Sequence, residues 1–232
     1  MKLSNDTMMV FKNFASINQN LVVKEGELQH TMSAQKNIVG KVKLKDKFPR
    51  EWPIYDLNEF LSVMSMYDNP NLDFKESFVV VRESENTDNF FNYQYSDVSV
   101  VTTPQQEIVM PEPEISFTLT SDVLTHIERA AAVIGAPDMV LESMTKGVAL
   151  LKVLDKKNDD SNVYAVKINI NNEDGKDVPY KFWFKVDNFK LLPGEYNVTC
   201  SAKRVSHFQH KNTDIEYWIA GEPATEYNAI NA

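Results

Sequence analysis

The chain has 232 residues, of which 43% are hydrophobic and 25% charged, and its formal net charge is −9. Its length and composition predict one large globular domain or two modest ones, each with a real core. The acidic balance argues against a protein that coats nucleic acid with its whole surface, although a basic patch on one face stays possible.

The first segment, residues 3–17, predicts an amphipathic helix with Ser4 or Asn5 as its N-cap. Phe11 and Phe14 recur at helical spacing on its apolar side. The segment is not a secretory signal, because it lacks an apolar core followed by a small-residue cleavage site. No stretch of the sequence approaches the roughly 18 consecutive apolar residues of a membrane span, so no membrane partner is expected.

Strand-like segments follow this helix. Residues 20–33 predict a hairpin turning at Glu25 and Gly26, and residues 37–45 predict a further strand. On this strand lysines alternate with apolar residues, with Lys41, Lys43 and Lys45 on one face and Val42 and Leu44 on the other. A lysine stripe can bind DNA. Clean alternation is more typical of the solvent side of a half-buried sheet, which is the interpretation we favour.

A second helix is predicted over residues 55–67 and a strand pair over residues 71–83. The aromatic run at residues 90–95 could stack on bases or could be part of a strand. Stacking sites normally lie in a cationic groove, whereas no lysine or arginine occurs from residue 83 to residue 128. We therefore predict a strand whose one face carries Phe91, Tyr93 and Tyr95.

Residues 104–114 predict an extended linker, because prolines stand at positions 104, 111 and 113. This acidic segment contains an uninterrupted apolar run, Ile108, Val109 and Met110.

The second half repeats the order of the first. Residues 117–135 predict a helix capped by Thr120 or Ser121 and stopped by Gly135. The strands that follow are expected in residues 139–154, 162–170, 194–204 and 214–222, with a weaker helix over residues 185–192. A repeat of roughly a hundred residues indicates a duplicated domain rather than a solenoid. The predicted fold is therefore α+β, with domains 1–103 and 115–232 joined by the linker 104–114.

The sequence offers no catalytic chemistry. Its seven glycines are well separated, so they form no phosphate-binding loop, and no G-x-S-x-G motif occurs. The single cysteine, Cys200, excludes an internal disulfide, suits a reducing cytoplasm and is expected to be a buried thiol. His207 and His210 have a spacing that could bind metal on a helix, but a solvated pair is the better interpretation. No catalytic residue, metal or cofactor is predicted.

A few cations lie on or beside the predicted helices. Lys12 falls opposite Phe11 and Phe14, and His126 and Arg129 lie on the polar side of the helix over residues 117–135. Lys2 precedes the first helix and Lys190 lies in the weak one. Each of these alone is an ordinary solvated residue.

Three segments, "MKLSNDTMMVFKNFASIN", "PIYDLNEFL" and "LPGEYNV", resemble the sliding clamps of T4-type bacteriophages, which are DNA polymerase processivity factors. The resemblance implies two tandem clamp domains with outer antiparallel sheets and inner helices, and a closed homotrimeric ring around duplex DNA. It implies no catalytic activity, an ATP-dependent clamp loader, and a phage DNA polymerase whose terminal peptide enters an apolar pocket between the two halves. The place of action would be the cytoplasm of an infected bacterial host.

The resemblance also assigns roles to residues. Those expected to face DNA in the ring's hole are Lys2, Lys12, His126, Arg129 and Lys190. A few such cations give a weak, salt-sensitive contact without sequence preference, which suits sliding. Ile108, Val109 and Met110 would form a lip of the peptide pocket, or would simply pack the linker onto the domain, and the two roles are compatible.

The second helix departs from the family expectation, because Asp56, Glu59 and Asp68 surround it and it has no cation. Two other functions stay open from the residues alone. One is a viral structural or assembly protein without a DNA role, and the other is an enzyme that uses His207 or His210.

Overall fold

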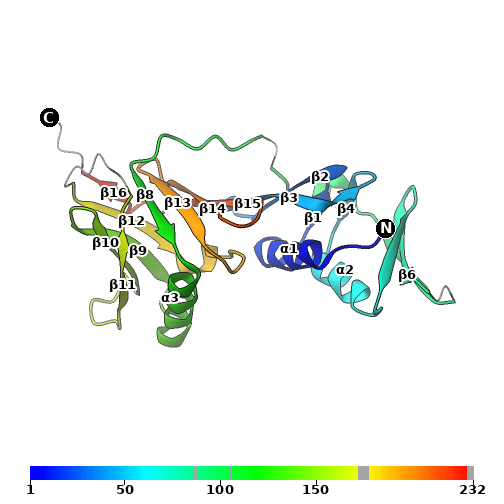
Figure 1. The fold of residues 1–232 in the computed structure, drawn as a ribbon, viewed down its shortest axis with the longest axis horizontal. Helices are drawn as coiled ribbons and strands as arrows, with labels where there is room; N and C mark the ends of the chain where they lie inside the picture. Colours follow the sequence, from blue (N-terminus) through cyan, green and yellow to red (C-terminus); the bar gives the residue numbers. More distant parts are fainter. Residues whose placement is uncertain (86–87, 105, 172–177, 229–232) are drawn as a thin grey trace. The chain divides into compact units, whose positions relative to one another are not determined.

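Two units make up the chain in the computed structural model, residues 1–107 and residues 108–232 (Figure 1). The structure describes residues 1–85, 88–104, 106–171 and 178–228. In both units helices pack on antiparallel sheets. The α+β class expected from the sequence is confirmed.

The first unit contains the following elements in chain order: α1 (Asn5–Ile17), β1 (Leu21–Val23), β2 (Gly26–Met32), β3 (Ile38–Phe48), β4 (Trp52–Ile54), α2 (Leu57–Met64), β5 (Pro70–Phe74), β6 (Phe78–Glu83), β7 (Phe90–Gln94) and the 3-10 turn η1 (Val98–Val100). β1 pairs with β4 and β2 pairs with β3, while β5, β6 and β7 form a three-stranded sheet.

Local sequence explains where α1 begins and which side it buries. The Ser4 hydroxyl accepts the Thr7 N–H and caps the helix. Phe11 and Phe14 are fully buried where α1 packs on β3 and beside α2 (Figure 1). The helix is therefore fixed by its apolar side, and its polar side faces solvent.

An aromatic cluster forms the core of the first unit. Trp52 lies at its centre, with ring centroids 6.3 Å from Phe48, 5.1 Å from Phe60, 5.5 Å from Phe74 and 6.0 Å from Tyr95. The Trp52 side chain has no solvent exposure. β4, α2 and the sheet of β5 to β7 are thus held together by one large side chain.

The second unit contains β8 (Ile115–Leu119), α3 (Ser121–Ile134), β9 (Asp138–Thr145), β10 (Val148–Leu154), β11 (Tyr164–Asn169), β12 (Tyr180–Lys185), the 3-10 turn η2 (Val186–Asn188), β13 (Tyr196–Ser201), β14 (Val205–His210), β15 (Ile215–Ala220) and β16 (Glu226–Tyr227). One sheet has the order β11-β10-β9-β12-β16, and β15, β14, β13 and β8 are neighbours in another.

The predicted ends of α3 are confirmed. The Thr120 hydroxyl accepts the Val123 N–H at the N-cap, and Gly135 ends the helix in the left-handed region at φ 63°. Leu124 and Ile127 are buried against β10 and β11. The opposite side of α3 faces solvent.

The helix predicted over residues 185–192 is wrong. Only the single 3-10 turn η2 forms there, and Phe189, Leu191 and Leu192 are buried one after another. At the end of the segment the backbone bonds to tyrosine hydroxyls: Leu192 N–H donates to the Tyr217 hydroxyl, and the Tyr196 hydroxyl donates to the Leu192 carbonyl. Among the described residues of the second unit, α3 is therefore the one α-helix.

Candidate nucleic-acid interface

The solvent side of α1 carries a lysine at mid-helix. Asn5, Met9, Lys12 and Ser16 are exposed, at the i, i+4, i+7 and i+11 spacing of one helix face. Lys12 lies opposite the buried Phe11 and Phe14, as predicted. Across the described parts of the chain, no carboxylate pairs with Lys12, so its ammonium group is available to a phosphate.

The solvent side of α3 carries the second candidate pair. His126 and Arg129 are both exposed. The Nδ1 atom of His126 lies 2.7 Å from the Asp122 carbonyl oxygen, so Nδ1 carries a proton and donates it, and Nε2 is left for another partner. Within the described residues Arg129 forms no ion pair, and its guanidinium can form a forked contact to phosphate.

The other two predicted cations have different surroundings. Lys2 is exposed just before α1. Lys190 is half-buried in the irregular segment after η2, between the buried residues Phe189 and Leu191. It therefore does not lie on a helix face as Lys12 and Arg129 do.

Each of these two helices has a carboxylate in its first turn, and α3 has another, Glu128, next to Arg129 in the sequence. Asp6 and Asp122 lie in the first turns of α1 and α3, where a negative charge stabilises the helix dipole. Lys12 follows Asp6 by about 9 Å of helix rise, and Arg129 follows Asp122 by about 10 Å. These separations are close to the Debye length of about 8 Å at physiological ionic strength, so solvent largely screens the Asp6 and Asp122 carboxylates from the two cations.

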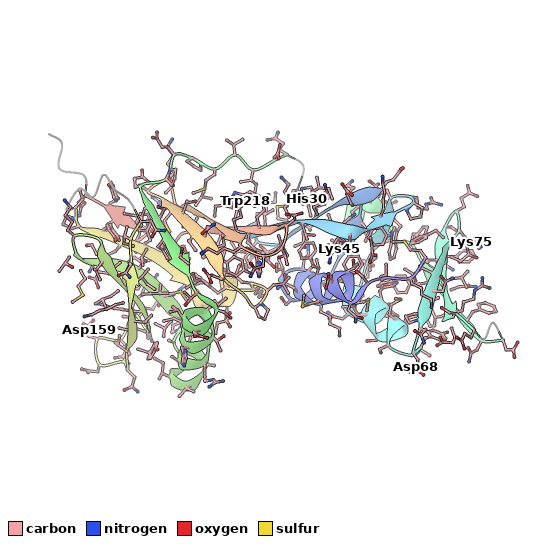
Figure 2. The ribbon with its side chains drawn as sticks, in the orientation of Figure 1. His30, Lys45, Asp68, Lys75, Asp159 and Trp218 are labelled. Carbon is pink, nitrogen blue, oxygen red and sulfur yellow. The ribbon has the colours of Figure 1, made fainter. Side chains whose placement is uncertain are left out.

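Several lysines of the sheets, in contrast, are paired with carboxylates. In the first unit Lys41 pairs with Glu107 at 3.2 Å, Lys43 with Glu27 at 3.1 Å and Lys45 with Asp6 at 2.9 Å (Lys45 is labelled in Figure 2). In the second unit Lys152 and Lys181 pair with Glu142, and Lys156 and Lys185 pair with Asp138.

Val42 and Leu44 are buried, so the predicted alternation of β3 is confirmed. Because its lysines already have partners, the β3 stripe is a poor phosphate site, which agrees with the interpretation that we favoured.

The linker is anchored by hydrogen bonds and an ion pair near both of its ends. Glu107 pairs with Lys41. Further along, the Ser201 hydroxyl donates to the Glu112 carbonyl, and the Glu114 carboxylate accepts the Ala202 N–H at 2.7 Å.

Between these anchors lies the predicted lip. Val109 is 84% exposed, whereas Ile108 and Met110 are half-buried. Val109 therefore points outward, while its two neighbours pack inward.

The histidine pair predicted to be solvated is not a pair. His207 and His210 lie on β14 at positions of opposite parity, so they point to opposite faces. His207 is half-buried, stacks on Trp218 and contacts Glu216 at 2.9 Å. Glu216 reaches His207 from the neighbouring strand β15, a contact that the sequence analysis did not predict.

The described residues also show neither a metal-binding cluster nor a reactive thiol. In the described parts of the chain, no group of three or more histidine, cysteine, aspartate and glutamate residues is placed to hold a metal ion. Cys200 is fully buried, as expected, and burial raises the pKa of its thiol to about 12, so the thiol stays protonated and unreactive near neutral pH. None of the helices described is both long and apolar enough to cross a membrane.

Sequence reasoning missed two surface features. Tyr55 and Met66, which flank α2, are 61% and 68% exposed. β7 lies at the edge of its sheet, with Phe90 59% exposed. The uncharged run at residues 90–95 was a signal for an open edge strand, but strand order is needed to see it.

Comparison with known proteins gives concordant results. Residues 4–103 match the family model described as DNA polymerase processivity factor. The chain is 30% identical to the sliding clamp of Vibrio phage KVP40 over 226 residues, covering 96% of this chain and 99% of that protein. It is 25% identical to the sliding clamp of Enterobacteria phage T4, covering 88% of each chain.

Solved structures of proliferating cellular nuclear antigen have the same fold. The Entamoeba histolytica protein has a TM-score of 0.67 at 13% identity, covering 93% of this chain and 94% of that one. The Thermococcus kodakaraensis protein has a TM-score of 0.67 at 16% identity, covering 94% and 96%.

Proposed function

Because the chain belongs to the sliding clamps, a family of DNA polymerase processivity factors, we propose that three copies of it close into a ring around duplex DNA. As a member of this family it is a non-enzymatic bacteriophage processivity factor for DNA polymerase. The family leaves no support for a structural protein without a DNA role, or for an enzyme that uses His207 or His210.

The distribution of unpaired cations carries the proposal. Lys12 and Arg129 stand at mid-helix without carboxylate partners among the described residues, whereas Lys41, Lys43 and Lys45 of β3 are paired. Phosphate contacts would then come from the helices, with Lys2, His126 and Lys190 as the further proposed contacts. So few contacts give weak binding that salt removes easily. Encirclement is the property that would keep such a protein on DNA.

Open sheet edges offer a way to close the ring. β7 is one edge, and Tyr95 N–H donates to the Ser77 carbonyl, which fixes the alternation of hydrogen bonds between β6 and β7. Phe90, Asn92 and Gln94 therefore turn their backbone N–H groups away from β6. β11 is another edge, where by the same alternation Lys167 does so.

Two different edges on one chain suit a head-to-tail interface, which closes into a ring when the rotation permits. We propose pairing of β7 in one copy with β11 in the next. β7 is the preferred edge of the first unit because it is uncharged and has an exposed phenylalanine, features that leave it unprotected.

The decisive test is retention on circular DNA. Protein loaded onto a nicked circular duplex should stay bound through gel filtration in moderate salt and should be lost once a restriction enzyme cuts the circle. Linear DNA of the same length with blocked ends should restore retention. Equal retention on circular and cut DNA would contradict encirclement.

We further propose that an ATP-dependent loader opens the ring and that polymerase binds through a terminal peptide at the lip. The domains would be 1–103 and 115–232, joined by the linker 104–114. The place of action would be the cytoplasm of the infected bacterium.

Val109→Asp tests the lip. Because Val109 is 84% exposed, the substitution should leave the fold and the trimer intact. A charge in place of an apolar contact should weaken binding of the polymerase C-terminal peptide by about tenfold or more, measured by fluorescence anisotropy. Val133→Asp is the matched control, since Val133 on α3 is also exposed, at 79%. Equal affinity of wild type and Val109→Asp would remove Val109 from the proposed site.

A further inference from the structure

α2 presents a solvent face unlike those of α1 and α3. Glu59 and Ser62 on the helix and Tyr55 and Met66 just beyond its two ends are exposed, and we call these four residues the α2 face. No lysine, arginine or histidine occurs from residue 51 to residue 74. Asp68, which follows the helix, adds a further exposed carboxylate (Figure 2).

The orientation of α2 is fixed, so the helix cannot turn a different side to solvent. Leu57, Phe60 and Leu61 are buried on the opposite side, and Phe60 packs on Trp52. The N-terminus is tied down as well, because the Tyr93 hydroxyl donates to the Asp56 carbonyl at 2.9 Å. Rotation of α2 would expose this core, so the acidic side is held toward solvent.

The N-terminus of α2 is already occupied by a negative charge. Helix N-termini bind phosphate through free N–H groups. In α2 the Asp56 carboxylate accepts the Asn58 and Glu59 N–H groups, both at 3.0 Å, and the Gln19 amide at 2.8 Å. The hydrogen bond from the Glu59 N–H, followed by that from Gln19, lowers the pKa of Asp56.

The serine hydroxyls of α2 are also committed. Ser62 donates to the Asn58 carbonyl at 2.8 Å, and Ser65 donates to the Ser62 carbonyl at 2.7 Å. Serine, lysine, arginine and helix N-termini are the usual donors to DNA phosphates. On α2 the serine hydroxyls and the N–H groups of the helix N-terminus already bond to neighbouring residues, and no lysine or arginine is present. The donors that remain for phosphate are the Tyr55 hydroxyl and the Asn58 amide.

We propose that α2 is a wall of the DNA channel that does not bind DNA, so that within the first unit the phosphate contacts come from α1 and from Lys2 just before it. This inference rests on the proposed function. Its consequence is mechanical: with Glu59 and Asp68 repelling phosphates beside α1, each subunit keeps few simultaneous contacts, and the ring slides with low friction. Since a ring holds on by topology, a surface that repels the duplex need not release it.

The test adds a cation to the wall. Ser62→Lys places an ammonium group on the exposed α2 face, and lysine is a good helix former. Met66→Lys does the same beyond the helix end, in case the first variant fails to fold. Gln35→Lys adds the same charge in the exposed turn between β2 and β3, outside α2, and is the matched control.

The measurement is one-dimensional diffusion of the loaded, labelled ring on stretched DNA over a range of salt concentrations. Ser62→Lys and Met66→Lys should slide several-fold more slowly than wild type. Their binding to short, open-ended duplexes should gain up to about 0.9 in salt slope for each added phosphate contact. Gln35→Lys should diffuse as wild type does.

Retention on circular DNA separates the two possible failures. If both lysine variants stay on the circle but slide as fast as wild type, α2 does not face DNA, and this inference is overturned while the proposed function stands. If Gln35→Lys slows the ring equally, net charge rather than the α2 face sets friction, which also overturns it. If wild type leaves the circle, the proposed function fails and this inference fails with it.

Discussion

Asn92→Pro should dissolve the proposed trimer and abolish processive synthesis. Asn92 lies in the middle of β7, opposite Val80 of β6. The Tyr95–Ser77 hydrogen bond places Asn92 at a non-hydrogen-bonded position of this pair, so its N–H points out of the sheet. Proline there removes a donor from the open edge without breaking a bond to β6, and edge strands tolerate proline when the N–H faces outward. The same interface occurs at every junction of a ring, so one substitution weakens all of them.

Sedimentation velocity at micromolar concentration should show a trimer for wild type and monomers for Asn92→Pro. Asn92→Thr keeps the N–H and favours a strand, so it is the control and should remain trimeric. Far-UV circular dichroism checks that the monomer keeps its fold. A folded Asn92→Pro protein that still sediments as a trimer would show that β7 is not at the interface.

The helix ends and the strand alternation could be predicted because they depend on residues close together in the sequence. Ser4, Thr120 and Gly135 act within one helical turn of their own positions, and the alternation of β3 follows from a period of two. The candidate cations Lys12 and Arg129 could be placed on helix faces for the same reason. The family resemblance then supplied what periodicity does not contain, namely which side of the helices matters.

Features that depend on partners far along the chain could not be predicted. The helix expected at residues 185–192 gave way to a 3-10 turn because the hydroxyls of Tyr196 and Tyr217 bind the backbone of Leu192. Glu216 reaches His207 across a strand pair that no local pattern reveals. Even the outward direction of Val109, between two half-buried neighbours, depends on how the anchored linker lies.

The acidic residues at the helix N-termini have a local structural cause, whereas the exposed cations at mid-helix do not. Asp6, Asp56 and Asp122 stand where helix capping and the helix dipole favour acids, so their presence says little about DNA. Lys12 and Arg129 have no such structural reason. A cation without a structural role on an exposed helix face is the better functional signal, even in a chain whose net charge is −9.

Trp52→Ala should lower the free energy of unfolding by about 3–5 kcal/mol, the range for removing a large aromatic side chain from a core. Trp52 is fully buried, and its ring contacts aromatic rings from β3, α2 and β5. Loss of this side chain leaves a cavity that β4 and α2 cannot both close. Because α2 and the sheet that contains β7 depend on this core, trimer formation and the circular-DNA retention should fail together.

Two further substitutions serve as comparisons for Trp52→Ala. Trp183→Ala removes the same side chain from a half-buried position on β12, where Lys156 covers the ring at 5.6 Å, and should cost much less. Trp52→Phe should be the mildest change at position 52. The indole Nε1 of Trp52 is buried without a hydrogen-bond partner among the described residues, so removing it forfeits no bond and relieves an unsatisfied donor. Urea unfolding followed by far-UV circular dichroism gives all three values. A Trp52→Ala protein no less stable than Trp183→Ala would mean that the aromatic cluster does not hold the first unit together.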